Sequence, residues 1–371
     1  MRPTPFLPCT TGVSNNLTRI DGRELINFSG NNYLGMSGDP GVTQAGKAAL
    51  DMYGTSISAS RLASGTRPLH NELERDLADV IGHLMSRGDL IVHDERVHNS
   101  IITGALLSGA DRRSFLHNDW ELLNEILNRV RRNYRRVLVV IEGVYSMEGD
   151  YPDVPRFVEV KNRHVAWLMI DEAHSIGTMG RGGRGMVQFF DIESREIEIW
   201  MGTLSKAFGA CGGYVAGSRP LIEYLKFTCP GVIFTIGLSP ASAAAARYVI
   251  QHLQDDRDRV SALHARAESF LSLYEQHGFD TGACQNTPIV PVMLGSSIHA
   301  LKSARLMEER GISVQTILYP AVSKAGARLR FFINALHTET QLATTIETLA
   351  AVLEEIDPVY PRNRARTSPS R

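Results

Sequence analysis

The stretch "WMGTLSKAFGACGG", residues 200–213, ends one of the apolar runs that define the fold and carries a single cation, Lys206. Glycines follow at positions 209, 212 and 213. Glycine has no side chain, so these positions let the backbone pass close to a neighbouring group. A lysine in this place is either a solvated strand end or an amine held against a ligand. Its role depends on the residues that the fold brings beside it.

Other short apolar runs lie on both sides of this stretch and end in polar or glycine residues. They are DLIVHD (89–94), RRVLVVIEG (135–143), VAWLMIDEAH (165–174), EIEIWMG (196–202) and GGYVAG (212–217). Helix-like or irregular segments separate them, which predicts a doubly wound, mostly parallel α/β sheet with buried strands. Ligands of such sheets bind at the carboxyl ends of the strands, where the chain places Asp94, Glu142, Asp171 and Thr203.

The pattern changes near residue 238, where alanine-rich and amphipathic helices alternate with short strands at 288–294 and 327–336. We therefore expect a large cofactor-binding domain over residues 46–237 and a smaller α+β domain over 238–357. Residues 1–45 are expected to pack on the smaller domain. A helix is predicted at 69–80. The basic, Pro- and Ser-containing end at 358–371 lacks apolar periodicity, which predicts disorder.

Composition excludes several classes of protein. The chain has 371 residues, 43% of them hydrophobic, and a net charge of −1, which gives no reason to expect nucleic acid as a partner. It contains neither a signal-peptide pattern nor an apolar run long enough to span a membrane, so we expect a cytoplasmic protein. The four cysteines are too scattered for a zinc motif and too few for a disulfide scaffold.

Two short motifs suggest other chemistries. DEAH (171–174) has the spelling of a nucleotide-hydrolysis motif, and GVTQAGKA (41–48) resembles a phosphate-binding loop. Ala48, however, stands where such a loop needs a hydroxyl group for magnesium. His93 and His98 follow a strand without a cysteine or a third histidine nearby, so no metal site is predicted.

An acidic residue that ends one buried strand and a lysine that follows another are the pair that pyridoxal 5'-phosphate (PLP) requires. The lysine forms a Schiff base with the aldehyde of the cofactor, and the carboxylate keeps the pyridine nitrogen protonated. Here Asp171 supplies the carboxylate, Lys206 the amine, and Thr203 a hydroxyl group for the phosphate. Alone, Asp171 would be a strand-end cap and Lys206 a surface residue. Together they predict a PLP site.

Groups of residues along the chain extend this prediction. In order they are NFSGNNYLGM, SASRLASGTRPLHNELE, HDERVHNSI, EGVYSMEGD, IDEAHSIGTMGRGGRG, GTLSKAFG with GGYVAG, and ARLRFFINALH. From about residue 20 to 355 the chain resembles the α-oxoamine synthases, which include serine palmitoyltransferase, 8-amino-7-oxononanoate synthase, 5-aminolevulinate synthase and 2-amino-3-ketobutyrate CoA ligase. The resemblance implies a fold-type I PLP-dependent transferase.

The resemblance also implies roles for residues around the cofactor. Lys206 matches the Schiff-base lysine, which also removes the α-proton of the substrate. Asp171 matches the partner of the pyridine nitrogen, and His174 the residue that hydrogen-bonds the phenolic oxygen. His98 matches the histidine that stacks on the ring and meets the substrate carboxylate.

Five further positions match residues at the edge of the family's site. Ser146 lies where the family places a serine near the ring oxygen, although a turn-forming serine is the alternative. Thr203 would bind the phosphate, and Thr235 would reach the phosphate of the neighbouring subunit's cofactor. Arg330 matches the anchor of the substrate carboxylate, and Asn31 faces the substrate region. For Arg330 and Asn31, a purely structural role is the alternative.

The implied reaction is the condensation of glycine, serine or alanine with an acyl thioester, usually with decarboxylation, to give an α-amino ketone. A shared phosphate contact at Thr235 implies a homodimer. The acyl donor is acyl-CoA or an acyl carrier protein. The run YGTSISASR (53–61), in place of a glycine-rich run of coenzyme A-dependent relatives, suggests the acyl carrier protein, and both donors stay open. A non-catalytic partner subunit, or another fold-type I enzyme such as an aldolase or aminotransferase, is the alternative.

One part of the family pattern is missing. Relatives carry a strand and a glycine-containing turn that hold the cofactor phosphate between the segments that end at Gly82 and begin at His83 here. About 20 residues are therefore expected to be absent at this point. Either the printed chain omits them, or the protein is a natural deletion variant with weak or no activity.

Overall fold

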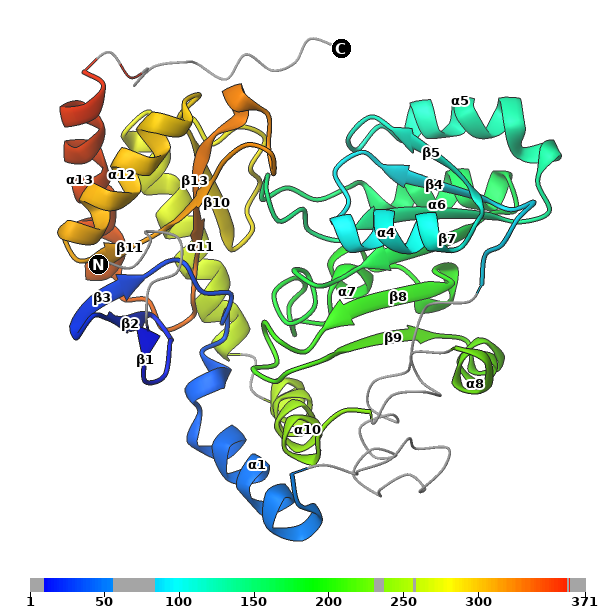
Figure 1. Ribbon diagram of the computed structural model, residues 1–371, viewed down its shortest axis with the longest axis horizontal. Helices are drawn as coiled ribbons and strands as arrows, with labels where there is room; N and C mark the ends of the chain where they lie inside the picture. The colour runs from blue at the N-terminus through cyan, green and yellow to red at the C-terminus, as the bar shows by residue number, and fades with distance from the viewer. Residues whose placement is uncertain (1–9, 56–83, 230–236, 256–257, 359, 361–371) are drawn as a thin grey trace. The chain divides into compact units, whose positions relative to one another are not determined.

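The computed structural model describes residues 10–55, 84–229, 237–255, 258–358 and 360 (Figure 1). Contacts divide the chain into two compact units. Unit 1 consists of Met1–Gly38, Ser146–Asp150 and Asp258–Arg371, and unit 2 of Asp39–Tyr145 and Tyr151–Arg257. The predicted helix at 69–80, the junction of Gly82 with His83, and Thr235 lie outside the described residues, as does most of the predicted tail.

The core of unit 2 is a six-stranded sheet in the order β5-β4-β6-β7-β8-β9, visible on the right of Figure 1. Five strands are parallel, and β9 runs antiparallel to β8. This confirms the mostly parallel sheet that the apolar runs predict. The strands are β4 (Leu90–Asp94), β5 (Asp111–Phe115), β6 (Val137–Glu142), β7 (Trp167–Asp171), β8 (Ile199–Thr203) and β9 (Gly213–Gly217).

Burial explains why the central strands read as continuous apolar runs. Every residue of β4 and β6 is buried, as expected for strands that are covered on both faces. At the sheet edge, β5 buries only Phe115, and its sequence DRRSF is correspondingly polar.

Helices cover both faces of this sheet and complete unit 2. On one face, side chains of α4 and α8 join side chains of the strands in a single apolar cluster. Elsewhere α6 packs against β7 and α5, and α1 packs against α10. The helices are α1 (Pro40–Tyr53), α4 (Asn99–Leu107), α5 (Trp120–Val130), α6 (Val154–Arg163), α7 (Met186–Phe190), α8 (Arg219–Thr228) and α10 (Pro240–Asp255), with 3-10 turns η2 (Arg131–Asn133) and η3 (Ser194–Glu196).

Unit 1 contains two small sheets and three long helices. One sheet has the order β1-β2-β3-β11 and the other β10-β13-β12. The parallel pairing of β3 with β11 joins the beginning of the chain to its last third. The strands are β1 (Thr10–Thr11), β2 (Leu17–Ile20), β3 (Arg23–Asn27), β10 (Ile289–Met293), β11 (Ile312–Ser313), β12 (Gln315–Ile317) and β13 (Arg328–Phe332); the helices are α11 (Asp258–Gln276), α12 (Ser297–Glu309) and α13 (Glu339–Ile356), with 3-10 turns η1 (Met36–Gly38) and η4 (Lys324–Gly326).

One sequence segment lies in a different unit from the one expected. Helix α10 belongs to unit 2, whereas the sequence put everything from residue 238 onward in the smaller domain. The contact of α10 with α1, which lies about 200 residues earlier in the chain, accounts for this, and periodicity alone does not reveal it. The loop-like motif at 41–48 lies inside α1, which Asp39 caps by accepting hydrogen bonds from the backbone N–H groups of Gly41 and Val42. Among the described residues, no helix is long and apolar enough to cross a membrane.

Candidate active site

The carboxyl ends of four parallel strands carry the polar residues that the sequence singles out. Asp94, Glu142, Asp171 and Thr203 are the last residues of β4, β6, β7 and β8. These strands are neighbours in the sheet, so the four side chains lie along one edge. In a doubly wound sheet this edge is where ligands bind.

Lys206 lies just past β8 and contacts the histidine that follows β7. Its Nζ atom is 2.9 Å from Nε2 of His174. Lys206 is half-buried and His174 is 8% exposed. The turn behind the lysine is closed by a hydrogen bond from the N–H of Ala210 to the carbonyl of Leu204. An amine and an imidazole this close can share or exchange a proton.

The Asp171 carboxyl is buried at the same edge. Its Oδ1 atom accepts a hydrogen bond of 2.8 Å from the N–H of Ala173. Burial raises the pKa of Asp171, whereas this hydrogen bond and the positive charges of Lys206 and His98 lower it. A protonated ring nitrogen beside Asp171 would supply the opposite charge that favours its ionised form.

His98 begins helix α4 and is held by the end of β6. Its backbone N–H donates to Oε1 of Glu142 at 2.6 Å, and its ring Nδ1 accepts from the N–H of Ser100. The ring is exposed, as a group that is to contact a ligand must be. Glu142 is 4% exposed, and burial and the charges of Asp171 and Asp94 raise the pKa of its carboxyl well above 4.5. The sequence placed Glu142 at the strand end but gave it no role.

Asp94 has partners that the sequence analysis missed. Its Oδ1 lies 3.1 Å from Nδ1 of His117, and its Oδ2 accepts from the N–H of Asn118 at 2.7 Å. Burial favours the neutral acid, but the hydrogen bonds and His117 outweigh it, so the pKa of Asp94 is lowered. The ring of His117 packs edge-on against Tyr145, with the centroids 4.5 Å apart. This network fixes the loop behind the strand ends.

Thr203 offers its hydroxyl group together with a second one. Its Oγ1 atom lies 2.7 Å from Oγ of Ser205 and donates to the carbonyl of Gly212 at 3.1 Å. Thr203 is half-buried and Ser205 is exposed. Two hydroxyl groups and the glycine-rich turn form a small polar surface one residue before Lys206. Ser205 did not emerge from the sequence, because serine is common in turns.

Glu172, the residue after Asp171, is a second buried acid that the sequence overlooked. Its Oε1 accepts a hydrogen bond of 2.7 Å from the N–H of Met186. Burial raises the pKa of Glu172 to about 7, and the neighbouring Asp171 adds to this effect. Glu172 therefore ties the loop between β7 and α7 to the strand that carries Asp171.

Three of the predicted residues lie in unit 1. Arg330, on β13, donates from Nη1 to the backbone carbonyl of Ser146 at 2.7 Å and from Nη2 to Oε1 of Gln315 at 2.6 Å. Its Nε atom is buried and has no hydrogen-bond partner among the described residues. Burial lowers the pKa of Arg330 to about 10. Asn31 is half-buried in the loop between β3 and η1. The structure thus joins Ser146 to Arg330, through the backbone of Ser146.

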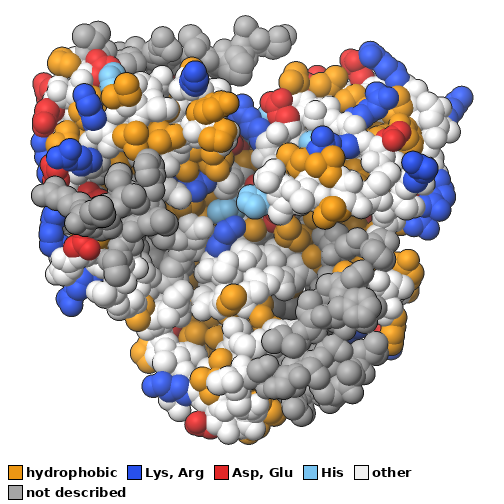
Figure 2. All heavy atoms as spheres, viewed as in Figure 1, with side chains coloured by type: hydrophobic (Ala, Val, Ile, Leu, Met, Phe, Trp, Pro, Cys, Tyr) orange, Lys and Arg blue, Asp and Glu red, His pale blue; other side chains and the backbone are white. Residues whose placement is uncertain are grey.

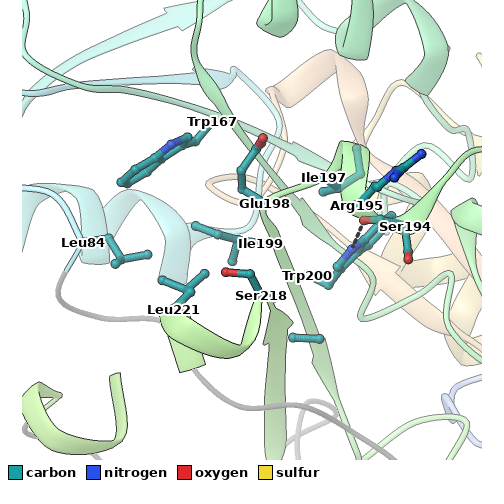
Figure 3. A pocket seen from close by; sticks show the side chains of 12 residues that line it. Leu84, Trp167, Ser194, Arg195, Ile197, Glu198, Ile199, Trp200, Ser218 and Leu221 are labelled. Atoms are coloured by element: carbon teal, nitrogen blue, oxygen red, sulfur yellow. Dashed lines mark hydrogen bonds between the residues drawn. The ribbon is translucent and has the colours of Figure 1, made fainter. Parts of the chain in front are cut away.

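A pocket of about 510 Å³ lies at the other ends of the strands, in unit 2. Trp167 and Ile199, which begin β7 and β8, line it, together with Leu221 of α8 (Figure 3). Its acid, Glu198, is satisfied by Nζ of Lys161 at 2.7 Å and by the N–H of Leu168 at 2.7 Å. The pocket therefore lies away from the carboxyl ends, and the one acid among its described lining residues is already paired.

The donor set at the carboxyl ends fits PLP. A buried carboxyl, a half-buried amine beside an imidazole, an exposed imidazole at a helix start and a pair of hydroxyl groups lie in one unit, at Asp171, Lys206, His174, His98, Thr203 and Ser205. PLP needs a carboxylate, an amine and phosphate-binding hydroxyl groups. Among the described residues, no group of three or more His, Cys, Asp or Glu side chains could hold a metal ion.

Comparison with known proteins agrees with this chemistry. The sequence pattern of the aminotransferase class I and II family matches residues 83–349. An 8-amino-7-oxononanoate synthase from Fervidobacterium nodosum is 40% identical, over 87% of each chain. A structure of serine palmitoyltransferase from S. paucimobilis with bound PLP and myriocin has a TM-score of 0.90 at 30% identity. It covers 95% of this chain and 93% of that one.

The same alignments show that this chain is shorter than its relatives within the matched region. The Fervidobacterium alignment spans 345 positions, whereas 87% of 371 residues is about 323, so about 22 aligned positions have no residue here. An 8-amino-7-oxononanoate synthase from Thermoanaerobacter pseudethanolicus gives 357 positions against 91% of the chain, about 338 residues. The place of the missing positions stays a prediction.

The site and the matched relatives therefore identify the chain. Its fold, its buried carboxylate and its lysine–histidine pair are those that PLP chemistry needs. Its relatives match along most of the chain. The chain belongs to the aminotransferase class I and II family and, within it, to the PLP-dependent α-oxoamine synthases.

Proposed function

We propose that this chain joins the α-carbon of an amino acid to the acyl group of a thioester and releases carbon dioxide and the free thiol. The product is an α-amino ketone. The observation that carries the proposal is the 2.9 Å contact of Lys206 with His174, beside the buried carboxyl of Asp171. An amine in that place can both bind a carbonyl group and move a proton.

Four residues of unit 2 are assigned tasks in this reaction. PLP, when bound, supplies an aldehyde that binds amines and a ring that accepts electrons. Asp171 would hold the ring nitrogen, and Thr203 would hold the phosphate. Lys206 would take the α-proton of the amino acid, because its amine can accept a proton and lies beside the imidazole of His174. His174 orients that amine and would bond the ring oxygen.

The substrate carboxylate is assigned to Arg330. The buried Nε of this residue lacks a partner, and a carboxylate accepts from a guanidinium group through two parallel hydrogen bonds. His98, whose ring is exposed and whose backbone is fixed by Glu142, is assigned to the ring face and to the same carboxylate. Asn31 and the side chain of Ser146 are proposed as further contacts to substrate and ring oxygen.

Alanine is the first amino acid to test. The names of the curated relatives describe a nonanoate with an amino group on carbon 8 and a keto group on carbon 7. Decarboxylative condensation of alanine places a methyl group next to the amino carbon, as that product requires. Glycine and serine are the alternatives, serine because of the likeness to serine palmitoyltransferase.

The acyl donor is proposed to arrive on a carrier protein. Exposed arginines gather on β5 and in and around η2, where Figure 2 shows Lys and Arg side chains over the region of β5 and α5; they include Arg112, Arg113, Arg132 and Arg135. Such a surface favours an acidic partner and raises its association rate. Arg112→Glu combined with Arg113→Glu should slow turnover with an acyl carrier protein and leave turnover with acyl-CoA unchanged.

A homodimer and a cytoplasmic location complete the proposal. Met52 of α1 and Phe227 of α8 are exposed by 72% and 65%, and such apolar side chains favour a protein interface. Phe227→Glu should halve the mass in solution. Cys211, Cys229 and Cys284 form no disulfide within the described part of the chain, which supports a reducing compartment.

Release of free thiol tests the reaction. The protein is incubated with PLP, with each of glycine, serine and alanine, and with acyl-CoA or acyl-carrier donors. Thiol release that depends on the amino acid and on Lys206 supports a condensing enzyme. Amino-acid turnover without thiol release would indicate an aldolase or aminotransferase instead. Co-purification with a longer sister chain, and no turnover without it, would indicate a non-catalytic partner subunit, which the positions missing from the alignment favour.

A further inference from the structure

A second pocket of unit 2, of about 430 Å³, lies between helix α4 and the sheet. Its walls come from α4 on one side and from β4, β6, β7, β8 and β9 on the other, and its volume is typical of small-molecule sites. The residues that define it best are Ile101, Ala105, Val140, Met169, Met201 and Val215.

Strand alternation connects this pocket to the active site. Side chains two residues apart point to the same face of a sheet. Val140 precedes Glu142 by two residues on β6, and Met169 precedes Asp171 by two on β7. The pocket therefore occupies the catalytic face of the sheet, one step of about 7 Å toward the amino ends of the strands.

Two residues that line the pocket lie next to residues of the active site. Gly202 lines it and is followed directly by Thr203. Ser100 lines it from α4, and its hydroxyl group lies 2.8 Å from Nδ1 of His98. A ligand in the pocket would thus have one end beside His98 and Thr203.

The chemistry of the lining is apolar. Seventeen of the described residues line the pocket, and none of these seventeen is Asp, Glu, Lys, Arg or His. The polar side chains are the hydroxyl groups of Ser100, Ser108 and Tyr214. A hydrocarbon chain gains free energy in such a place, whereas a carboxylate would lose its hydration without gaining a cation.

We propose that this pocket binds the hydrocarbon chain of the acyl thioester, and that the preferred donor ends in a methyl group. The inference rests on the proposed condensation and names its substrate class. It separates this chain from the 8-amino-7-oxononanoate synthases, whose product carries a carboxylate at the far end of the chain. The thioester carbonyl would lie at the Thr203 end, within reach of the amino acid.

Gly104 offers a way to fill the pocket. It lines the cavity from the middle of α4, and a Cβ atom added there meets no atom within 4 Å. The backbone therefore has room for a side chain at this position, and Gly104→Phe should narrow the pocket. Leu107→Phe is the matched control, because Leu107 lies on the same helix, is 84% exposed and does not line the pocket.

The experiment measures kcat/KM for thiol release with a series of saturated acyl donors and with dicarboxylic donors of equal length. In the wild type, kcat/KM should rise about fourfold with each methylene group that the pocket buries, until the pocket is full. Gly104→Phe should remove this rise and leave the acetyl donor unchanged, and Leu107→Phe should behave as the wild type. Thermal unfolding verifies that each variant is folded.

The outcomes separate the two proposals. Activity that is highest with dicarboxylic donors, or a chain-length dependence that Gly104→Phe leaves intact, overturns the pocket assignment and leaves the condensation standing. Absence of thiol release with every donor, including acetyl, overturns the condensation itself. In that case binding of a fluorescent fatty acyl probe still reports on the pocket, and equal affinity in the wild type and Gly104→Phe would count against it.

Discussion

Nε2 of His174 lies 2.9 Å from Nζ of Lys206, so an imidazole on the loop after β7 fixes the amine that follows β8. The contact joins two neighbouring strands of the parallel sheet at their carboxyl ends. It defines where a carbonyl compound has to lie in order to react with the lysine.

Removal of His174 should impair turnover more than folding. His174→Phe loses the hydrogen bond to Lys206 and the proton that the imidazole can share, and we expect kcat to fall about 100-fold or more. His252→Gln is the control, because His252 is an exposed histidine on α10 whose Nδ1 bonds the carbonyl of Tyr248 on the same helix. Steady-state thiol release measures both. A loss below threefold in His174→Phe would contradict the role.

Glu142 should act as a neutral acceptor that holds His98. Glu142→Gln keeps an oxygen for the N–H of His98, whereas Glu142→Leu leaves that N–H unpaired, which costs about 1–3 kcal/mol. We expect kcat/KM of Glu142→Gln to be near the wild-type value and kcat/KM of Glu142→Leu to be much lower. The charged groups that face Glu142 are Asp171, Asp94, Lys206 and His98.

The pH profile distinguishes this role from simple packing. The pKa of Glu142 is raised, and in the wild type its ionisation as the pH rises puts a second negative charge beside Asp171, so activity should decline. Glu142→Gln cannot ionise and should lack this decline. Identical alkaline limbs in the two proteins would refute the assignment.

Glu172 should make the protein less stable as pH rises. Its pKa is about 7 in the folded state and 4.5 in the unfolded chain. Between these values the folded state holds a proton that the unfolded state has lost, so the free energy of unfolding decreases with rising pH. The full effect is about 3 kcal/mol, present below pH 4.5 and lost above pH 7.

Glu172→Gln tests this pH dependence directly. The amide keeps an acceptor for the N–H of Met186 and carries no charge. Urea unfolding at pH 5 and pH 8 gives the free energy of unfolding of both proteins. Relative to the wild type, the variant should be more stable at pH 8 than at pH 5. The same difference at both pH values would show that Glu172 does not titrate in this window.

Arg330 should control the affinity for the amino acid. Arg330→Gln removes the cation, and Arg330→Lys keeps the charge but loses the planar pair of donors. We expect KM for the amino acid to rise about 10- to 100-fold in Arg330→Gln and by a smaller factor in Arg330→Lys. KM for the thioester should change little in either variant. Arg305→Gln, at an exposed position of α12, is the control. Equal effects on both substrates would indicate a structural role.

The strands of unit 2 could be predicted because parallel strands that are buried on both faces read as continuous apolar runs. The polar last residues of these strands predicted the edge at which the site lies, because ligands of such sheets bind at the carboxyl ends of the strands. β5 was not predicted, because an edge strand with exposed arginines has no continuous apolar run. No helix was predicted for α1, although Asp39 and Pro40 are a normal helix start.

The partners of the site residues were the hardest part to predict. His117 reaches Asp94 from 23 positions later in the chain, and Glu142 holds His98 across 44. Neither spacing is a motif, since only the order of strands in the sheet brings those positions together. Lys206, Asp171 and His174 were found because their residue types and strand positions together specify one chemistry.

The absorption spectrum of the purified protein with PLP tests the central claim most directly. The wild type should show the visible band of a lysine-bound cofactor, and reduction with borohydride should leave the cofactor's mass on the peptide that contains Lys206. Lys206→Ala should show neither, while its fold by circular dichroism stays unchanged. A wild-type protein that stays colourless with excess PLP, or a reduced adduct on another lysine, would contradict the account.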